Sequence, residues 1–284
     1  MRPTAPLWTT STPTAVSKSN WCLRAAVLAA AVLAATGPTA RAGFDANFTG
    51  MDPGLSMKLY FNGSNHSGIQ TGIYHWTQIP PNTTNALPTN FWTFCIEVTQ
   101  TFSNPVHYDL VNLESAPSPG NGAGNGTPGN PNGPMGTNKA NMIRELLAYV
   151  AGGNPTAFYA SLANSPTSSA EKVTAAAIQL SIWEIVFENS GTLDVSNGTF
   201  HANYAANASG TLQEQAVYQA NNWLNYLTST ANVSHARLDN VYGLTSGNQQ
   251  DQLVLTPVPA PSGLVLALTA LVPGLAAVRL RRKG

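Results

Sequence analysis

Cysteine is scarce in this sequence, which contains only Cys22 and Cys95. Cys22 precedes the first long apolar run, so it would be removed together with an N-terminal export signal. The mature protein would then retain Cys95 alone, and a single thiol excludes an internal disulfide, the usual reason for cysteine in an exported protein. Three interpretations of Cys95 remain: an inert buried side chain, a nucleophile, or one half of another covalent bond.

Charged residues are also few, at 9% of the chain. Eight of the 13 Lys and Arg residues lie in the two terminal segments, so residues 43–256 carry five basic residues against 13 acidic ones, a net charge of −8. This balance excludes a nucleic-acid partner, which requires a basic surface. The sequence also lacks HExxH, GxSxG, a phosphate-binding glycine-rich loop and a spaced Cys/His set, so we expect no metal, no cofactor and no enzyme.

Residues 1–42 are typical of a secretory signal peptide. Three basic residues precede the apolar run 25–35, and residues 40–42 have the small-x-small pattern of a cleavage site. We therefore expect export through the Sec pathway and a mature chain that starts at Gly43. An uncleaved anchor helix is the alternative, although the apolar run is short for a membrane span.

Residues 257–284 form a second terminal signal. It contains the motif Pro259-Ala260-Pro261, an apolar stretch 263–280 that could span a membrane, and a basic tail made of Arg279, Arg281, Arg282 and Lys283. The tail predicts a cytoplasmic C-terminus. The ending resembles the PEP-CTERM sorting signal of Gram-negative bacteria, except that Ala260 replaces the acidic residue. The resemblance implies a membrane tether, processing by an exosortase-like enzyme, and a final location at the cell surface or outside the cell; a simple tail anchor is the alternative.

Residues 43–256 change from strand-like to helix-like patterns along the chain. Runs rich in β-branched and aromatic residues occupy 55–61, 73–78, 91–98 and 106–113. Apolar residues at helical spacing occupy 141–151, 169–188 and 212–227, and Ser168 with Glu171 forms a capping box. We expect an α+β fold, with an antiparallel β-rich subdomain, a sheet or a barrel, followed by a helical subdomain. Residues 115–138, dense in Gly, Pro and Asn, are expected to be a flexible insertion.

One polar residue interrupts the expected helix at 169–188. From Val173 to Phe187 nearly every residue is apolar, which predicts burial on most faces, yet Gln179 stands in the middle. A buried carboxamide needs hydrogen-bond partners or another use. Gln179 and Trp183 are four residues apart and therefore share a face of the helix. A core glutamine bonded to neighbouring backbone is the simplest interpretation.

Two segments together resemble the signature of the bacterial surface thioester domain. Phe94-Cys95-Ile96 matches its aromatic-Cys-apolar motif, and Ile178-Gln179-Leu180-Ser181-Ile182-Trp183 matches its apolar-Gln-x-x-apolar-Trp motif on a later helix. Ile178 stands where threonine is frequent in such families, and Ser181 stands where alanine is frequent. The resemblance implies that the Cys95 thiol and the Gln179 amide condense, with loss of ammonia, into an internal thioester.

The resemblance also implies a function. An amine or hydroxyl on a surface ligand, protein or glycan, would attack the Gln179 carbonyl and leave the domain covalently attached, a single-use adhesion and not turnover. Apolar surface would protect the bond from water, and Glu184 would assist or solvate it; the surrounding residues are Trp92, Phe94, Ile182 and Trp183.

Two other interpretations stay open. The protein could be a non-covalent structural component of the extracellular matrix, sorted by its tail, with Cys95 as a buried core residue. Alternatively, carboxylates could meet in space for glycoside chemistry, the candidates being Glu97, Asp109, Glu184 and Glu188. His107 follows the Cys95 strand, and a solvated or structurally bonded histidine is favoured over a catalytic base there.

Overall fold

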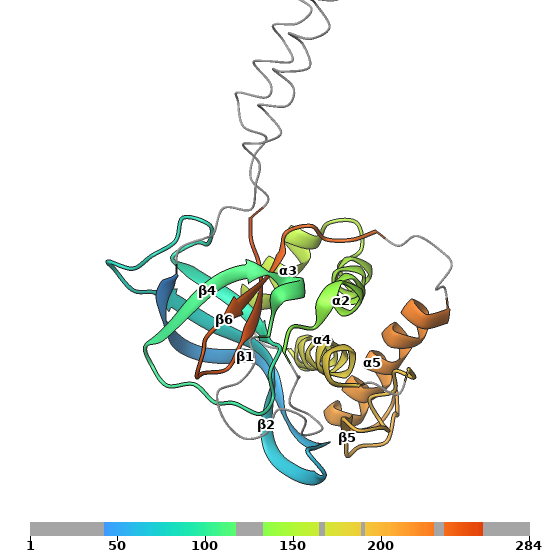
Figure 1. The fold of residues 1–284 in the computed structure, drawn as a ribbon. Helices are drawn as coiled ribbons and strands as arrows, with labels where there is room; N and C mark the ends of the chain where they lie inside the picture. The colour runs from blue at the N-terminus through green and yellow to red at the C-terminus, as the bar shows by residue number, and fades with distance from the viewer. Residues whose placement is uncertain (1–42, 118–132, 165–167, 189–190, 230–235, 258–284) are drawn as a thin grey trace, which may run out of the picture. The chain divides into compact units, whose positions relative to one another are not determined.

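A computed structural model describes residues 43–117, 133–164, 168–188, 191–229 and 236–257 (Figure 1). The expected signal peptide, the sorting motif 259–261, the apolar stretch 263–280 and the basic tail lie outside these residues. Within the described ranges, no helix has the length and apolar character needed to cross a membrane.

Seven strands in the described residues form one antiparallel sheet. They are β1 (Phe44–Phe61), β2 (Ser64–Gln78), β3 (Asn90–Cys95), β4 (Val106–Asn112), β5 (His201–Ala202), β6 (Val241–Thr245) and β7 (Gln252–Leu255). Their order is β2-β3-β7-β6-β4-β1-β5, and β1 also pairs with β2. Six strands therefore complete a ring, which leaves β5 as a short addition beside β1.

The long β1–β2 hairpin turns at Asn62-Gly63. Both residues have positive φ angles, 54° and 73°. A two-residue hairpin turn with both central residues in the left-handed region is of type I′, whose twist matches the flanking strands, and Asn-Gly is the preferred pair for it. The turn thus fixes the register of the hairpin, in which Phe61 faces Ser64.

Four α-helices occupy the described residues beside the sheet: α2 (Gly136–Ala151), α3 (Pro155–Asn164), α4 (Ser169–Phe187) and α5 (Leu212–Ser229). Helix α4 is central, because it contacts β1, β2 and β3 and also packs against α2 and α5 (Figure 1). The capping box of Ser168 and Glu171 is present at its start. Residues from 175 to 187 are all buried, which confirms the expectation of burial on most faces of this helix.

The mixed helix and strand composition and the antiparallel sheet are confirmed, but the order of strands first and helices after is wrong. β6 and β7 follow α5 in the sequence, yet they complete the ring between β4 and β3. These strands have only five and four residues, too short for a period-2 pattern to stand out. Helix α3 was also not expected. The described part of the chain after residue 40 falls in one compact unit.

The ends of the expected insertion 115–138 are packed in the fold. Ala116 is completely buried, and its carbonyl accepts a hydrogen bond from the N–H of Met135 at 2.9 Å. Helix α2 starts one residue later, at Gly136. The two ends of the segment therefore meet, and only its middle, residues 118–132, lies outside the described structure.

Candidate functional site

Cys95 is the last residue of β3 and is completely buried. On one side, it faces Gln252 of β7. On the other side, β2 pairs with β3 only from Thr77–Asn90 to Tyr74–Thr93, so the ladder stops two residues before Cys95. The N–H and C=O of Cys95 therefore need another hydrogen-bond partner on the side where β2 no longer pairs with β3.

Gln179 provides that partner. The N–H of Cys95 donates to Oε1 of Gln179 at 2.8 Å, and Nε2 of Gln179 donates to the carbonyl oxygen of Cys95 at 2.6 Å. The side-chain amide therefore replaces the missing strand, and both residues are 0% exposed. A satisfied core glutamine is what the simplest interpretation of the sequence requires. The backbone that satisfies it, however, belongs to Cys95.

One of these two bonds, from the Cys95 N–H to Oε1, has the geometry to assist nucleophilic attack on the amide carbon. A hydrogen bond from the Cys95 N–H stabilises negative charge that develops on Oε1 when a nucleophile adds to the amide carbon, as in an oxyanion hole. The thiol belongs to the same residue as that N–H, so the short tether limits the distance between sulfur and amide. Proximity of this kind is worth roughly 7–11 kcal/mol of barrier when the alignment is favourable.

The thiol of Cys95 is held in a dry, largely main-chain environment. Sγ donates to the carbonyl of Glu97 at 2.7 Å and accepts from the N–H of Glu97 at 3.3 Å. Burial raises the pKa of the thiol above its ordinary range, and the carboxyls of Glu97 and Asp251 raise it further, while the N–H of Glu97 and the indole of Trp183 oppose the shift. The thiol is therefore protonated in the resting site, and its attack requires a base.

The indole N–H of Trp183 lies near the sulfur of Cys95. It lies close enough to the sulfur to lower the thiol pKa. It is also buried, and no acceptor among the described residues meets hydrogen-bond geometry with it. The contact between this N–H and the sulfur is therefore loose, and a group that accepts a hydrogen bond from the indole would be stabilised there.

A buried pair of carboxyls lies beside the thiol. Glu97 is completely buried; its Oε1 accepts from Nε2 of Gln100 at 2.8 Å and its Oε2 from the N–H of Asp251 at 3.4 Å. Asp251, also buried, accepts from the N–H of Ser246 at 2.6 Å. Burial, and then the charge of Asp251, raise the pKa of Glu97 to about 7. Glu97 can thus accept or release a proton near neutral pH.

Aromatic and aliphatic side chains enclose the site. Phe94, Ile182 and Trp183 are completely buried, whereas Trp92 is half-buried and packs edge-on against Phe94, with ring centroids 6.2 Å apart. Tyr159 of α3 covers Phe94 in turn, at 6.4 Å. Cys95 and Gln179 are themselves 0% exposed, so bulk water does not reach their contact.

Glu184 lies on a different side of α4. Its Oε1 accepts from the N–H of Asp194 at 2.8 Å, and the charged groups that influence it are Glu188, Asp194 and Lys139. Burial raises its pKa to about 8. Five residues separate Glu184 from Gln179, about 140° around the helix, so the two side chains diverge. The structure therefore does not place Glu184 beside the thiol.

The remaining candidates from the sequence are dispersed. Asp109 is exposed on β4, and Nδ1 of His107 contacts Oδ1 of Asp45 at 2.6 Å. Glu97 meets Asp251 and Glu184 influences Glu188, so the four carboxylates do not converge on one point. In the described part of the chain, no cluster of three His, Cys, Asp or Glu side chains could hold a metal ion.

Asp251 and Gln250 are the site residues that the sequence did not reveal. Nε2 of Gln250 donates to the carbonyl of Glu97 at 2.9 Å, so the loop before β7 fixes the strand end that carries the thiol. No signal in the sequence marks this contact, because the residues lie more than 150 positions apart. Comparison of the chain with models of protein families, with curated proteins and with solved structures found no match.

Proposed function

We propose that this protein attaches covalently to surface ligands through an internal thioester between Cys95 and Gln179. The observation that carries the proposal is the pair of hydrogen bonds, 2.8 and 2.6 Å long, between the Gln179 amide and the main chain of Cys95 in a fully buried site. A purely structural glutamine could bond to any strand end. This one bonds to the single cysteine of residues 43–257.

Bond formation is a condensation without an external reactant. The Cys95 sulfur adds to the amide carbon of Gln179, the carbon–nitrogen bond breaks, and the nitrogen leaves as ammonia with the proton that the thiol gives up. Glu97 is the candidate carrier of that proton, because its charge acts on the thiol of Cys95 and its own pKa of about 7 suits both uptake from sulfur and release to nitrogen. The Cys95 N–H stabilises the oxyanion between the two steps.

Capture reverses the roles of sulfur and nitrogen. An amine or hydroxyl of the ligand attacks the Gln179 carbonyl, an amide or ester bond forms, the carbon–sulfur bond breaks, and the thiol recovers a proton. The burial of both residues keeps the thioester from hydrolysis until a ligand arrives. Because the acyl group is consumed, each molecule reacts once and the protein is not an enzyme.

The proposed location follows from the two terminal segments of the sequence. Export through the Sec pathway, tethering by residues 263–280 and processing at Pro259-Ala260-Pro261 by an exosortase-like enzyme would place the domain at the cell surface or in the surrounding matrix. Ligands that carry amines or hydroxyls are abundant there. The net charge of −8 in residues 43–256 disfavours nucleic acid as a partner.

Intact mass spectrometry of the purified protein tests the proposal. The thioester predicts a mass lower than that of the mature chain by one ammonia, and no such deficit in C95A or Q179A. Addition of methylamine should then convert the deficit into a covalent adduct on Gln179. A full mass with a thiol that titrates after unfolding would overturn the proposal.

A non-covalent matrix protein is the second candidate, and one observation favours it. The Gln179 side chain already bonds to the N–H and C=O of Cys95, which β2 does not reach. This structural role alone explains why a glutamine occurs in an apolar helix. Under that function Cys95 is a small core residue, and C95S or C95A would leave adhesion unchanged. Under the thioester function, the same variants lose all covalent attachment.

A further inference from the structure

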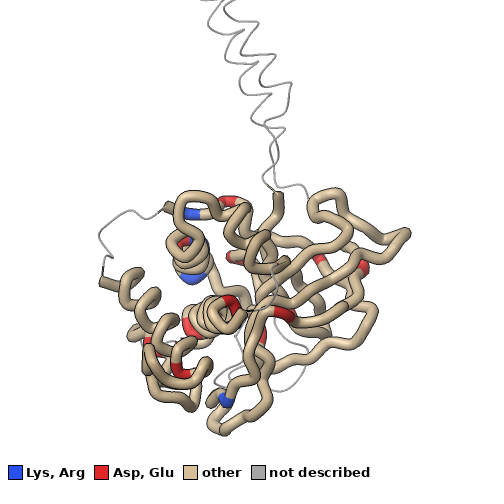
Figure 2. Tube along the Cα trace, turned by 180° about the vertical axis from the view of Figure 1, so that it is seen from behind, with Lys and Arg blue, Asp and Glu red and all other residues tan. Residues whose placement is uncertain are grey.

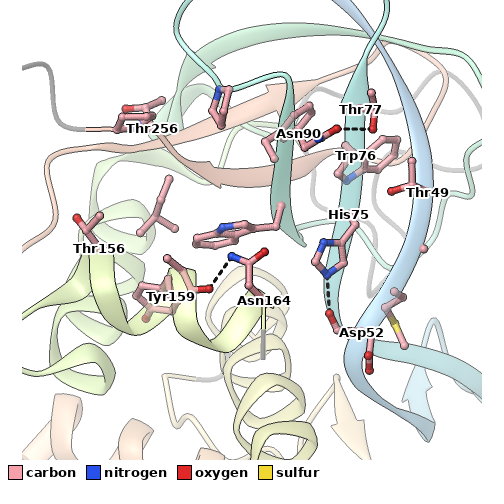
Figure 3. Close-up of a pocket in the computed structure, with 18 of the residues that line it drawn as sticks. Thr49, Asp52, His75, Trp76, Thr77, Asn90, Thr156, Tyr159, Asn164 and Thr256 are labelled. Atoms are coloured by element: carbon pink, nitrogen blue, oxygen red, sulfur yellow. Dashed lines mark hydrogen bonds between the residues drawn. The ribbon is translucent and has the colours of Figure 1, made fainter. Parts of the chain in front are cut away.

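A pocket of about 700 Å³ opens on the side of the fold where α3 faces the sheet (Figure 3). Its walls come from the bulged part of β1, from β2 and β3, from α3, and from the ends of β6 and β7. This volume lies within the range of about 300–1,000 Å³ typical of small-ligand sites. No role has so far been assigned to it.

The floor of the pocket is aromatic and its rim is polar and mostly uncharged. Trp76 and Tyr159 are buried beneath it, while Trp92 is half-buried and stacks on Tyr159 at 5.7 Å. The rim consists of amides and hydroxyls, from Thr49, Thr77, Asn90, Thr156, Asn164, Asn240 and Thr256. Asp52 and His75 are the ionisable lining residues other than Tyr159, and Lys and Arg are absent from the described lining (Figure 3). Lys and Arg are sparse along the whole described trace (Figure 2). An anionic ligand would therefore meet no lysine or arginine among the described lining residues.

Three asparagines of the rim are held in fixed orientations. Oδ1 of Asn90 accepts from Thr77 at 2.8 Å, Nδ2 of Asn164 donates to Ala160 at 2.7 Å, and Nδ2 of Asn240 donates to Thr256 at 2.5 Å. The other half of each amide has no hydrogen-bond partner among the described residues. The rim thus offers one amide donor and two amide acceptors beside an indole.

This combination matches the chemistry of a neutral sugar. A pyranose ring presents an apolar C–H face, which packs on an indole, and hydroxyls that both donate and accept. A proline-rich peptide also packs on aromatic rings, but proline has no N–H, so it would leave the acceptors of Asn164 and Asn240 unpaired. We propose that this pocket binds a neutral saccharide unit of a glycan.

The pocket and the candidate thioester share strand β3. Trp92 precedes Cys95 by three residues, about 10 Å along the strand, and this odd spacing places the two side chains on opposite faces of the sheet. A glycan held against Trp92 would therefore raise the local concentration of the ligand that carries it around this strand, without touching the Cys95 side chain. Saccharide binding itself needs no thioester, whereas this docking role rests on the proposed function.

Saturation-transfer NMR with neutral trisaccharides of glucose, galactose, mannose and N-acetylglucosamine tests the inference on the purified protein. The informative variants are A160R and A157R. Both alanines are exposed on α3, but only Ala160 lines the pocket. We expect at least one trisaccharide to bind, A160R to weaken it about tenfold or more, a loss of about 1.4 kcal/mol, and A157R to match the wild type. N90A should weaken it as well, because it removes the amide donor.

Three outcomes would overturn the inference: no trisaccharide binds, A160R binds as well as A157R, or a proline-rich decapeptide binds in the pocket and the trisaccharides do not. The C95A protein separates this result from the proposed function. It cannot form a thioester, yet it should bind the same trisaccharide as the wild type. Conversely, A160R should keep the ammonia deficit in its mass, since position 160 is exposed on α3 and makes no part of the Cys95–Gln179 contact.

Discussion

The side-chain amide of Gln179 and the main chain of Cys95 exchange two hydrogen bonds at the point where β2 leaves β3. One bond holds the amide carbonyl against the N–H of the cysteine, and the other holds the amide nitrogen against its carbonyl. The residue that completes the sheet edge is therefore also the residue whose carbonyl lies next to the only described thiol.

The hydrogen-bonded pair should stabilise the fold even without a thioester. In a C95A background, where the amide stays intact, Q179A should lower the free energy of unfolding by about 2–4 kcal/mol, because it orphans a buried N–H and C=O and leaves a cavity. Urea denaturation measures this. Q219A, at a half-buried glutamine on α5, is the matched control and should change the value by about 0.5 kcal/mol or less. Equal effects for the two variants would argue against a structural role for the pair.

Thioester formation should depend on the ionisation of Glu97. Ammonia in denaturant regenerates the Gln179 amide and the free thiol, after which refolding at a fixed pH restarts the reaction, and loss of ammonia is followed by mass. Because Glu97 accepts the thiol proton only when ionised, the rate should rise as the pH increases through about 7. E97Q should slow it by roughly 10²–10⁴-fold.

E184Q is the control for that experiment. Glu184 also has a raised pKa, of about 8, but its carboxylate faces Asp194 on another side of α4. The E184Q variant should form the thioester at the rate of the wild type. If E97Q forms the thioester at the wild-type rate, or if E184Q is the slower variant, Glu97 is not the base.

The stability of the fold should fall as the pH rises from about 5 to about 8. The folded pKa of Glu184, about 8, lies above its ordinary value of 4.5, so in this window the folded state binds a proton that the unfolded state has released. Protonated Glu184 therefore contributes fully to the free energy of unfolding below pH 4.5. This contribution, a few kcal/mol at most, is lost as the pH rises through the folded pKa. Thermal unfolding at several pH values measures the slope, which E184Q should flatten. A wild-type slope of the opposite sign would contradict the burial of a neutral Glu184.

The sequence contained enough to anticipate the pair but not its surroundings. Cys95 stood out because it was alone, and Gln179 because it was the one carboxamide in an apolar helix, so each departs from a local pattern. Asp251 departs from none, and it reaches Glu97 only because the short strand β7 closes the sheet beside β3. Pairing between strands that are far apart in the sequence leaves no local pattern of apolar residues, so the sequence did not predict it.

Glu184 is a different case. It follows Trp183 directly in the sequence, but consecutive helix residues point about 100° apart. Its partner Asp194 comes from the segment after α4, which carried no recognised element. The pocket beside α3 also had no signal in the sequence, because part of its lining comes from α3 and from the ends of β6 and β7, which were not expected, and these elements lie far along the chain from the lining residues of β1, β2 and β3.

The mass of the intact, natively purified protein is the most direct test of the central claim. The thioester predicts a deficit of one ammonia relative to the mature sequence, absent from C95A and from Q179A, and replaced by an adduct of methylamine on Gln179 when the amine is added. A full mass in the wild type, unchanged by methylamine and accompanied by one free thiol after unfolding, would contradict the account and leave Gln179 as a structural residue at the end of β3.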